Sequence, residues 1–517
     1  MNGICVFSRS NNCVSYTSKE IYIAAEFAKK QMISATLLNM LSKFSVKEFK
    51  EFGEFVRSPF FNKNENVISL YDYLKKYHPE FTGPKLKKEY VFSRLFKGKA
   101  YNDGFMRTVT FNLGKLAEDY LAYINFREDD LNRGINLLKE LNKRKLEKVF
   151  LKYYSEIEED INSIQYHDTE YFYKKYELEE QKEVYLDWSK FKQKDFKNYS
   201  EKTISYIDDE LTSFYLAKML NHYRFILDKE QYEQIKFDSS FTDHVLDYLL
   251  KKDDHFKNKI KIKLHLHEVL LIKEKRPEDY SVLKEILVTG VNYLSHSDRY
   301  SLHNILQSFL IEKSFGGAKG MQIERLELYK ICISQKLYAA SEHIYFDDLM
   351  FGNIVITAIA AKQFDWVEDF INRYSDEVSP ENRDVVHGYS LARLSFAKGG
   401  FEDSLKYLNG IKTIRHIQYK IPVRNLTLMV CYEMGMLTQA VYHIDSYRHF
   451  LTNNKESLSV IRHERVVNFL KFFAKLVKYR EKESPAEITK LISELEETNN
   501  TIEKSWLLEK AGEFNLN

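Results

Sequence analysis

The residues best suited to chemistry lie in a basic segment, residues 251–276, which holds nine lysines and arginines against four acidic residues. In the middle of this segment, basic and apolar side chains alternate one by one. A row of ammonium and imidazole groups can attract phosphate or carboxylate groups of a partner. We therefore predict a candidate anion-binding face, formed by Lys259, Lys261, Lys263, His265 and His267.

This alternation has two structural interpretations. A period of two residues is typical of a β-strand. However, the chain offers no second alternating run as a pairing partner, and an isolated strand leaves its backbone groups without hydrogen bonds. We predict a helix across residues 259–267. A strand remains the alternative interpretation.

Three further groups of residues have the composition of enzyme sites but not the spacing. His265 and His267 are two residues apart, whereas a helix presents two imidazoles to one metal ion at positions i and i+4. The glycine-rich stretch 316–320 lacks the Gly-Lys-Ser/Thr ending of a phosphate loop. Cys431 and His443 have no evident carboxylate that would orient the imidazole. The sequence therefore predicts a protein that is not an enzyme, with no catalytic residues, no metal site and no cofactor.

Nucleic-acid binding is the main alternative to a protein partner. Residues 40–126 contain short helices joined by tight turns, as in a helix-turn-helix. The candidate recognition helix, residues 105–126, carries only Arg107 and Lys115 before its apolar face begins, which gives few contacts to phosphates. Ordinary helix packing is therefore the preferred interpretation. A nucleic-acid-binding regulator that uses residues 40–126 or 251–276 is retained as the second hypothesis.

Composition predicts the fold class. The chain has 517 residues, of which 44% are hydrophobic and 29% charged, so disorder is excluded and several domains or one repeat array are expected. Only 7 prolines and 18 glycines interrupt it, which favours long helices over many-turned sheets. We predict an all-α fold. A net charge of +2 gives no overall attraction for nucleic acid or for an anionic membrane.

Cysteine usage and hydropathy predict the compartment. None of the four cysteines forms a CxxC pair, and Cys332 and Cys431 lie in apolar helical runs, which indicates buried thiols in a reducing environment. No apolar run approaches the roughly 18–20 residues that a membrane-spanning helix needs. We therefore expect a cytoplasmic protein with no membrane insertion.

The clearest organisation is an internal repeat between Asn353 and Ile444. Segments beginning at Lys362, Gly399 and Gly435 align with spacings of 37 and 36 residues. Each follows an apolar helical run: Ile354–Ala361, Tyr389–Ala397 and Leu426–Met434. A helix, a tight break and a second helix at this spacing predict a solenoid of helical hairpins.

Three sets of equivalent positions support the repeat. They are a large residue after the break, a small residue where two helices cross, and a large residue on the buried side of the second helix. The sets are Phe364, Phe401 and Leu437; Val367, Ser404 and Ala440; and Ile371, Leu408 and Ile444.

These positions resemble the tetratricopeptide repeat family, although its consensus tryptophan and proline are absent and the period is two or three residues longer. The resemblance implies a right-handed α-solenoid. The opening FSVKEFKEFGEFVRSPFFN, the turn YNDGFMR and the later FGNIV and FDWVEDFI segments are similar to a family of uncharacterised bacterial helical-repeat proteins. That second resemblance implies a helical fold and no particular activity.

We expect four regions along the chain. They are an N-terminal extension (residues 1–36), an N-terminal helical domain (37–127) that contains the capping-box pattern Ser45-Val-Lys-Glu48, a long-helix middle region (128–276), and tetratricopeptide-like repeats with C-terminal capping helices (277–517). For the extension we expect either a start codon assigned too early, with Met32 or Met40 as the natural start, or a disordered arm.

The function predicted from this organisation is a non-enzymatic scaffold for protein–protein interactions. Stacked hairpins create an extended concave surface that can hold a peptide or a partner protein. Polar residues inside apolar helices are the places where such a partner would be recognised. The candidate partner-binding residues are Asn353, Arg393 and Asn425. The identity of the partner and the oligomeric state are not predicted.

Overall fold

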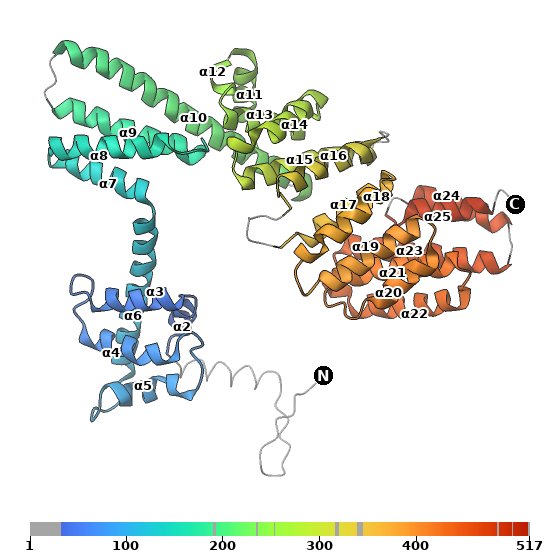
Figure 1. Ribbon diagram of the computed structural model, residues 1–517. Coiled ribbons are helices and arrows are strands. Elements are labelled where there is room, and N and C mark those ends of the chain that lie inside the picture. Colours follow the sequence, from blue (N-terminus) through green and yellow to red (C-terminus); the bar gives the residue numbers. More distant parts are fainter. Residues whose placement is uncertain are drawn as a thin grey trace. The chain divides into compact units, whose positions relative to one another are not determined.

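The computed structural model describes residues 33–189, 193–233, 236–252, 254–315, 320–338, 345–482, 485–498 and 500–514 (Figure 1). Within these ranges the chain is helical throughout, and the one β-type contact is an isolated parallel bridge between Phe346 and Val378. The predicted all-α fold is therefore confirmed. The chain divides into two compact units, Met1–Ser163 with Lys174–Ile207 and Ile164–Tyr173 with Asp208–Asn517.

The first unit begins with a small helical domain that has its own aromatic core. Ser45 and Glu48 form the predicted capping box at the start of α3. The domain consists of α2 (Ala35–Leu41), α3 (Val46–Arg57), α4 (Glu65–Leu74), the 3₁₀ turns η1 (Lys75–Tyr77) and η2 (Pro84–Leu86), α5 (Lys88–Leu95) and α6 (Asp103–Glu128).

Helices α3 and α4 approach each other at Gly53. A Cβ atom there would lie 2.4 Å from the Tyr71 hydroxyl, which donates a hydrogen bond to the Phe49 carbonyl at 2.8 Å. The absence of a side chain at Gly53 therefore makes this buried hydrogen bond possible.

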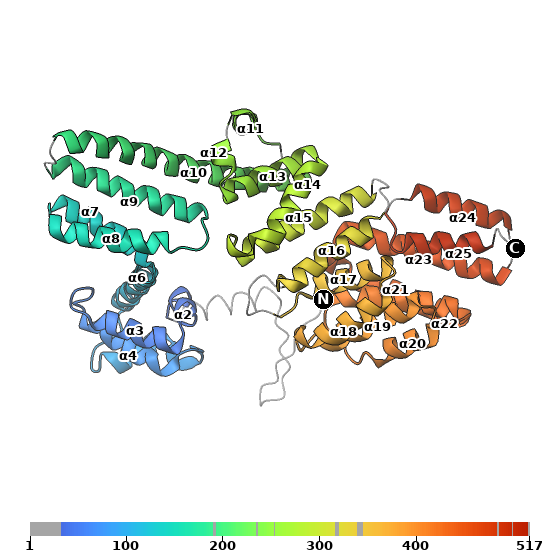
Figure 2. The same ribbon diagram turned by 45° about the horizontal axis from the view of Figure 1, so that its top comes forward.

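The first unit continues with α7 (Asp130–Lys143), α8 (Glu147–Asn162) and the part of α9 (Thr169–Trp188) from Lys174 onward. These three helices lie side by side in Figures 1 and 2. The Tyr154 hydroxyl of α8 donates to Glu179 of α9 at 2.9 Å, and Tyr185 of α9 donates to Glu147 at 2.9 Å. The long helix α10 (Gln193–Glu233) follows, and its residues are divided between the two units.

The second unit is a succession of short helices in which each helix packs against the next. Some helices also contact the second helix along the chain, as α17 does α19 and α19 does α21. The helices are α11 (Ser240–Lys252), α12 (Asp254–Lys257), α13 (Ile260–Glu274), α14 (Pro277–Thr289), η3 (Gly290–Asn292), α15 (His296–Phe315), α16 (Met321–Ser334), α17 (Asp348–Ala360), α18 (Phe364–Tyr374), η4 (Ser375–Glu377), α19 (Arg383–Ala397), α20 (Phe401–Gly410), α21 (Ile417–Glu433), α22 (Leu437–Asn453), η5 (Lys455–Ser457), α23 (Val460–Lys482), α24 (Pro485–Glu497) and α25 (Lys504–Glu513).

The three predicted breaks are turns of one kind. Lys362, Gly399 and Gly435 all have left-handed backbones, with φ of 56°, 81° and 71°. At each break, the N–H of the next residue returns to a carbonyl of the preceding helix, as Gly400 does to Ser395 at 2.9 Å. The left-handed residue itself donates a second bond, as Gly399 does to the Phe396 carbonyl at 3.0 Å. These two hydrogen bonds together form the Schellman motif, which caps the carbonyls at a helix end. The same motif ends α16 at Lys336 and α7 at Lys145.

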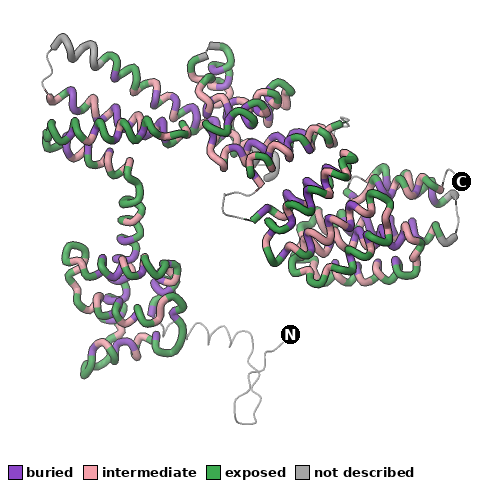
Figure 3. The backbone as a smooth tube through the Cα atoms, in the orientation of Figure 1, coloured by how far each residue is buried: buried purple, intermediate pink, exposed green. Residues whose placement is uncertain are grey.

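Small side chains lie where the paired helices cross, as the repeat predicts. Val367, Ser404 and Ala440 are fully buried, and the Ser404 hydroxyl donates to the Ala392 carbonyl at 2.8 Å. Buried residues alternate with exposed ones along these helices (Figure 3), and the buried ones form three clusters, each of which includes residues of more than one hairpin. The hairpins therefore share their cores.

Helix α21 begins nine residues before the predicted run, at Ile417, and contains Pro422. Proline has no N–H for the carbonyl four residues earlier, that of Gln418. Arg462 of α23 donates to this carbonyl at 3.2 Å. A side chain from a later helix thus supplies the hydrogen bond that the proline cannot make, and it ties α23 to α21.

We expect Gly399→Ala to destabilise the protein by about 1 kcal/mol, because an L-residue is disfavoured at a positive φ. Gly410→Ala is the matched control, since both positions have open space around a new Cβ but only Gly399 has a positive φ. The control should be neutral or stabilising by up to about 1 kcal/mol. Urea unfolding followed by circular dichroism compares them, and equal effects would contradict the assignment.

A double-mutant cycle tests the bond to the Gln418 carbonyl. Arg462→Met should lower the local stability of α21 by about 1 kcal/mol, because the carbonyl loses its donor. In a Pro422→Ala background, the new N–H at position 422 can bond the same carbonyl, so Arg462→Met should cost clearly less. Hydrogen exchange of α21 amides measures both values. Additive effects would show that the two residues do not share this carbonyl.

Candidate functional site

The basic stretch around residue 260 is a helix, as predicted: α13 begins at Ile260, directly after Lys259. In a helix, residues two positions apart point in different directions, so the alternating lysines and histidines do not form one face. Lys261 and His265 are buried, and Lys259, Lys263 and His267 are partly buried. The five predicted anion-binding residues are therefore distributed around α13.

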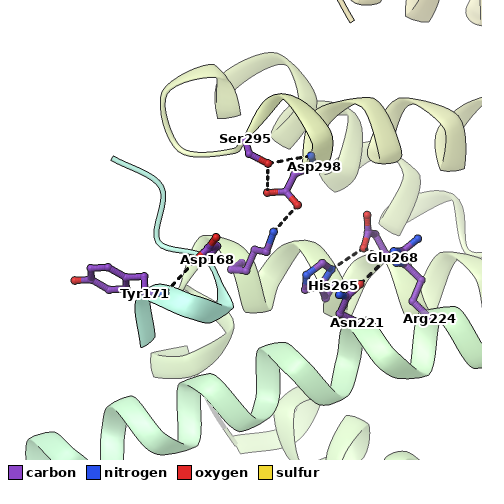
Figure 4. Close-up of polar contacts among 9 residues, drawn as sticks. Asp168, Tyr171, Asn221, Arg224, His265, Glu268, Ser295 and Asp298 are labelled. Carbon is purple, nitrogen blue, oxygen red and sulfur yellow. Dashed lines mark hydrogen bonds and ion pairs between the residues drawn. The ribbon is translucent and has the colours of Figure 1, made fainter. Parts of the chain in front are cut away.

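Four of these five residues bind acidic groups of the same chain. Figure 4 shows the bond between His265 and Glu268 and the bond between Ser295 and Asp298. The Lys261 ammonium lies 2.5 Å from Asp298, which also accepts a hydrogen bond from Ser295. Lys259 bonds Asp209 at 2.7 Å, His265 bonds Glu268 at 2.8 Å, and His267 bonds Asp279 at 2.7 Å. Lys263 has no ion-pair partner among the residues that the structure describes. Most of the predicted anion-binding residues are therefore bound to acidic groups within the protein.

Two acids of this cluster, Asp298 and Asp279, have a lowered pKa, which favours their charged form. Burial alone would raise the pKa of Asp298, but the charge and the hydrogen bond of Lys261 outweigh it and lower that pKa. Burial would also raise the pKa of the fully buried Asp279, and hydrogen bonds from His267 and Arg276 reverse the effect. Arg224 of α10 lies 3.5 Å from Glu268 and bonds Asn221 (Figure 4). These contacts join α10, α13, α14 and α15.

The three predicted partner-binding residues have different surroundings. Asn353 is exposed on α17. Arg393 of α19 forms an ion pair with Glu503 at 2.8 Å, just before α25. Asn425 of α21 is buried and accepts a hydrogen bond from the Tyr447 hydroxyl at 2.9 Å. The equivalent positions of the repeat therefore do not present one common surface to solvent.

A polar cavity of about 440 Å³ lies in the first unit. Its lining includes three lysines and two glutamates, and Lys182 lies 3.7 Å from Glu179. The opposite charges leave it without a strong preference for an anion or a cation. These lining lysines are Lys175, Lys182 and Lys202, and the glutamates are Glu158 and Glu179.

A groove between α22 and α23 has a more distinct character. It encloses about 540 Å³ and is lined on its α23 side by one face of that helix. Among the residues that the structure describes, its lining combines apolar side chains, which we call its floor, with basic side chains, which we call its edge, and contains no acidic residue. The floor residues are Leu451, Val467, Leu470 and Ala474, and the basic residues are Arg448, His463, Lys471, Lys475 and Lys478.

The sequence prediction missed this groove. The helical spacing of His463, Val467, Lys471 and Lys475 was a visible signal, because residues four apart share a helix face. Its meaning depended on knowing that α22 lies next to α23, which the residues alone do not indicate. The groove is the candidate functional site that the structure adds.

The side chains that the structure describes contain no group of three or more histidine, cysteine, aspartate or glutamate residues placed to hold a metal ion. None of the described helices combines the length and apolar character needed to cross a membrane. Comparison with family models, with curated proteins and with solved structures finds no match for this chain.

His303 of α15 gives the structure a measurable acid response. It is almost fully buried, and burial lowers its pKa to about 4. Between pH 6.5 and 4, the unfolded chain gains a proton at this residue that the folded protein does not hold, so stability falls as pH falls. We expect His303 to account for a loss of about 2 kcal/mol between pH 7 and pH 5.

His303→Gln should remove that part of the pH dependence, and the exposed His244→Gln should leave it unchanged. Hydrogen exchange of α15 at pH 7 and pH 5, corrected for intrinsic rates, measures the difference. A pH dependence that is the same in wild type and His303→Gln would contradict a neutral buried imidazole.

Proposed function

We propose that this protein is a non-enzymatic scaffold for protein–protein interactions, and that the hairpins of residues 277–514 form a right-handed, tetratricopeptide-like α-solenoid. Support comes from the repeated Schellman turns, the small residues at the helix crossings and the shared cores of successive hairpins. The free, buried Cys332 and Cys431 fit a reducing compartment, and we place its action in the cytoplasm.

The observation that carries this proposal is the groove between α22 and α23. Val467 of α23 lines this groove, and 41% of its surface is exposed. Apolar surface edged by charged side chains is typical of a site that another protein covers. Among the predicted partner-binding residues, exposed Asn353 offers a second point of contact, whereas Arg393 and Asn425 act within the fold.

Nucleic-acid binding receives less support from the same observations. A phosphate backbone requires several cations that are free to contact it. In the basic stretch of α13, Lys259, Lys261, His265 and His267 contact acids instead. The recognition helix predicted within residues 40–126 is part of α6, where Arg107 pairs with Asp103 and Lys115 with Glu118.

Affinity purification of the tagged protein from its native cells, with and without nuclease, tests the proposal. We expect defined proteins that remain bound after nuclease treatment and that are lost with Val467→Asp. Val288→Asp on α14 is the matched control, because this valine is similarly exposed at 50% and does not line the groove. Partners that disappear on nuclease treatment would instead support the regulator hypothesis, and the absence of any partner would refute the scaffold.

A further inference from the structure

The groove between α22 and α23 has a chemistry that selects among possible partners. Its floor is apolar, and all of its ionisable lining residues are basic. Asp445 bonds Arg448, and Glu494 bonds Lys475 from outside the groove. Lys471 and Lys478 have no ion-pair partner within the part of the chain that the structure describes. Positive charge therefore remains at the edge of the apolar floor.

The shape of the groove favours a helix as its occupant. It follows α23 from His463 to Lys478, which corresponds to about 22 Å at about 1.5 Å per residue. Two adjacent helices form its walls, and a third helix can pack its side chains between their ridges. An extended strand would find no unpaired backbone edge there, because both walls are helical.

The floor also distinguishes a peptide from a nucleic acid. Single-stranded nucleic acids bind by stacking their bases on exposed aromatic rings beside cations. The aromatic residues of α23 nearest the groove, Phe472 and Phe473, are buried in the core. Val467, which is exposed, and Ala474, which is partly exposed, instead offer aliphatic surface, which matches the apolar stripe of an amphipathic helix.

We propose that this groove binds an acidic amphipathic helix of a partner protein, about 15 residues long, with its apolar stripe on the floor and its carboxylates near Lys471 and Lys478. This inference rests on the proposed scaffold function and specifies the class of partner. Lysines at the edge would contribute association rate and selectivity, and the aliphatic floor would contribute most of the affinity.

Selection from a displayed library of random 16-residue peptides on the full-length protein tests the proposal. We expect enriched peptides to be rich in Asp and Glu, with apolar residues at i, i+3 or i+4, and i+7. Enrichment of basic or uncharged peptides would overturn it. So would tighter binding of a 16-nucleotide single-stranded RNA to the same groove.

The best acidic peptide is then measured by fluorescence anisotropy. Val467→Asp should weaken the affinity for this peptide by about tenfold or more. Lys478→Glu should weaken the affinity for the peptide by about threefold or more at low salt, and by much less at 0.5 M salt. Lys406→Glu on α20 is the matched control, because this lysine is equally exposed and outside the groove, and it should have no effect. Circular dichroism of each variant confirms folding.

Two outcomes separate this inference from the scaffold function. If proteins remain bound in cells but no acidic peptide depends on Val467 or Lys478, the groove assignment is wrong and the scaffold stands. If acidic peptides bind as expected but no protein is recovered from cells, the groove chemistry holds and the scaffold function fails. A groove that is occupied by a second copy of the chain would appear as a dimer that Val467→Asp dissociates, and it would also overturn the inference.

Discussion

The second unit depends on one constraint: a pair of amphipathic helices cannot bury its apolar face alone. From α17 onward the hairpins share buried clusters: one cluster continues from α17 through α19, a second joins α19, α20 and α21, and a third continues from α21 through α25. The Schellman turns at Lys362, Gly399 and Gly435 serve this purpose because they reverse the chain within three residues and cap the last carbonyls. The number of residues between successive turns therefore sets how many residues each hairpin contributes to the core.

The same constraint explains the contacts at the C-terminal end. The last hairpin of the array has no following hairpin, so another segment must cover its apolar face. Helix α25 returns to α21, where Trp506 donates to Glu433 at 2.9 Å and Lys510 approaches the same carboxylate at 3.1 Å. Arg393 of α19 completes the attachment through Glu503. Residues separated by 73 to 110 positions thus hold the end of the array in place.

The sequence predicted the features that local physics determines. The capping box at Ser45 and the three breaks follow from short-range patterns, and the structure confirms each one. The helix after Lys259 is also confirmed, but it was predicted from the lack of a second alternating run and against the local period of two residues. Features that depend on distant residues could not be predicted in this way. Asn425 was expected at a surface, yet its partner Tyr447 belongs to the next helix of the hairpin. The Gln418 carbonyl in the first turn of α21 accepts a hydrogen bond from Arg462, which lies forty residues beyond Pro422.

The basic residues show how the same side chains acquire different roles from their surroundings. Around α13, lysines and histidines are opposed by Asp209, Asp298, Glu268 and Asp279, so their charge is used to join helices. On α23, Lys471 and Lys478 project at the edge of aliphatic surface that no described helix covers. Exposed charge beside an apolar surface opposes nonspecific association, because a partner must also supply carboxylates to match it. The number of lysines in the sequence therefore indicated α13 as the anion-binding segment. Whether a lysine can bind a partner depends, however, on whether an acid of the same chain already lies opposite it.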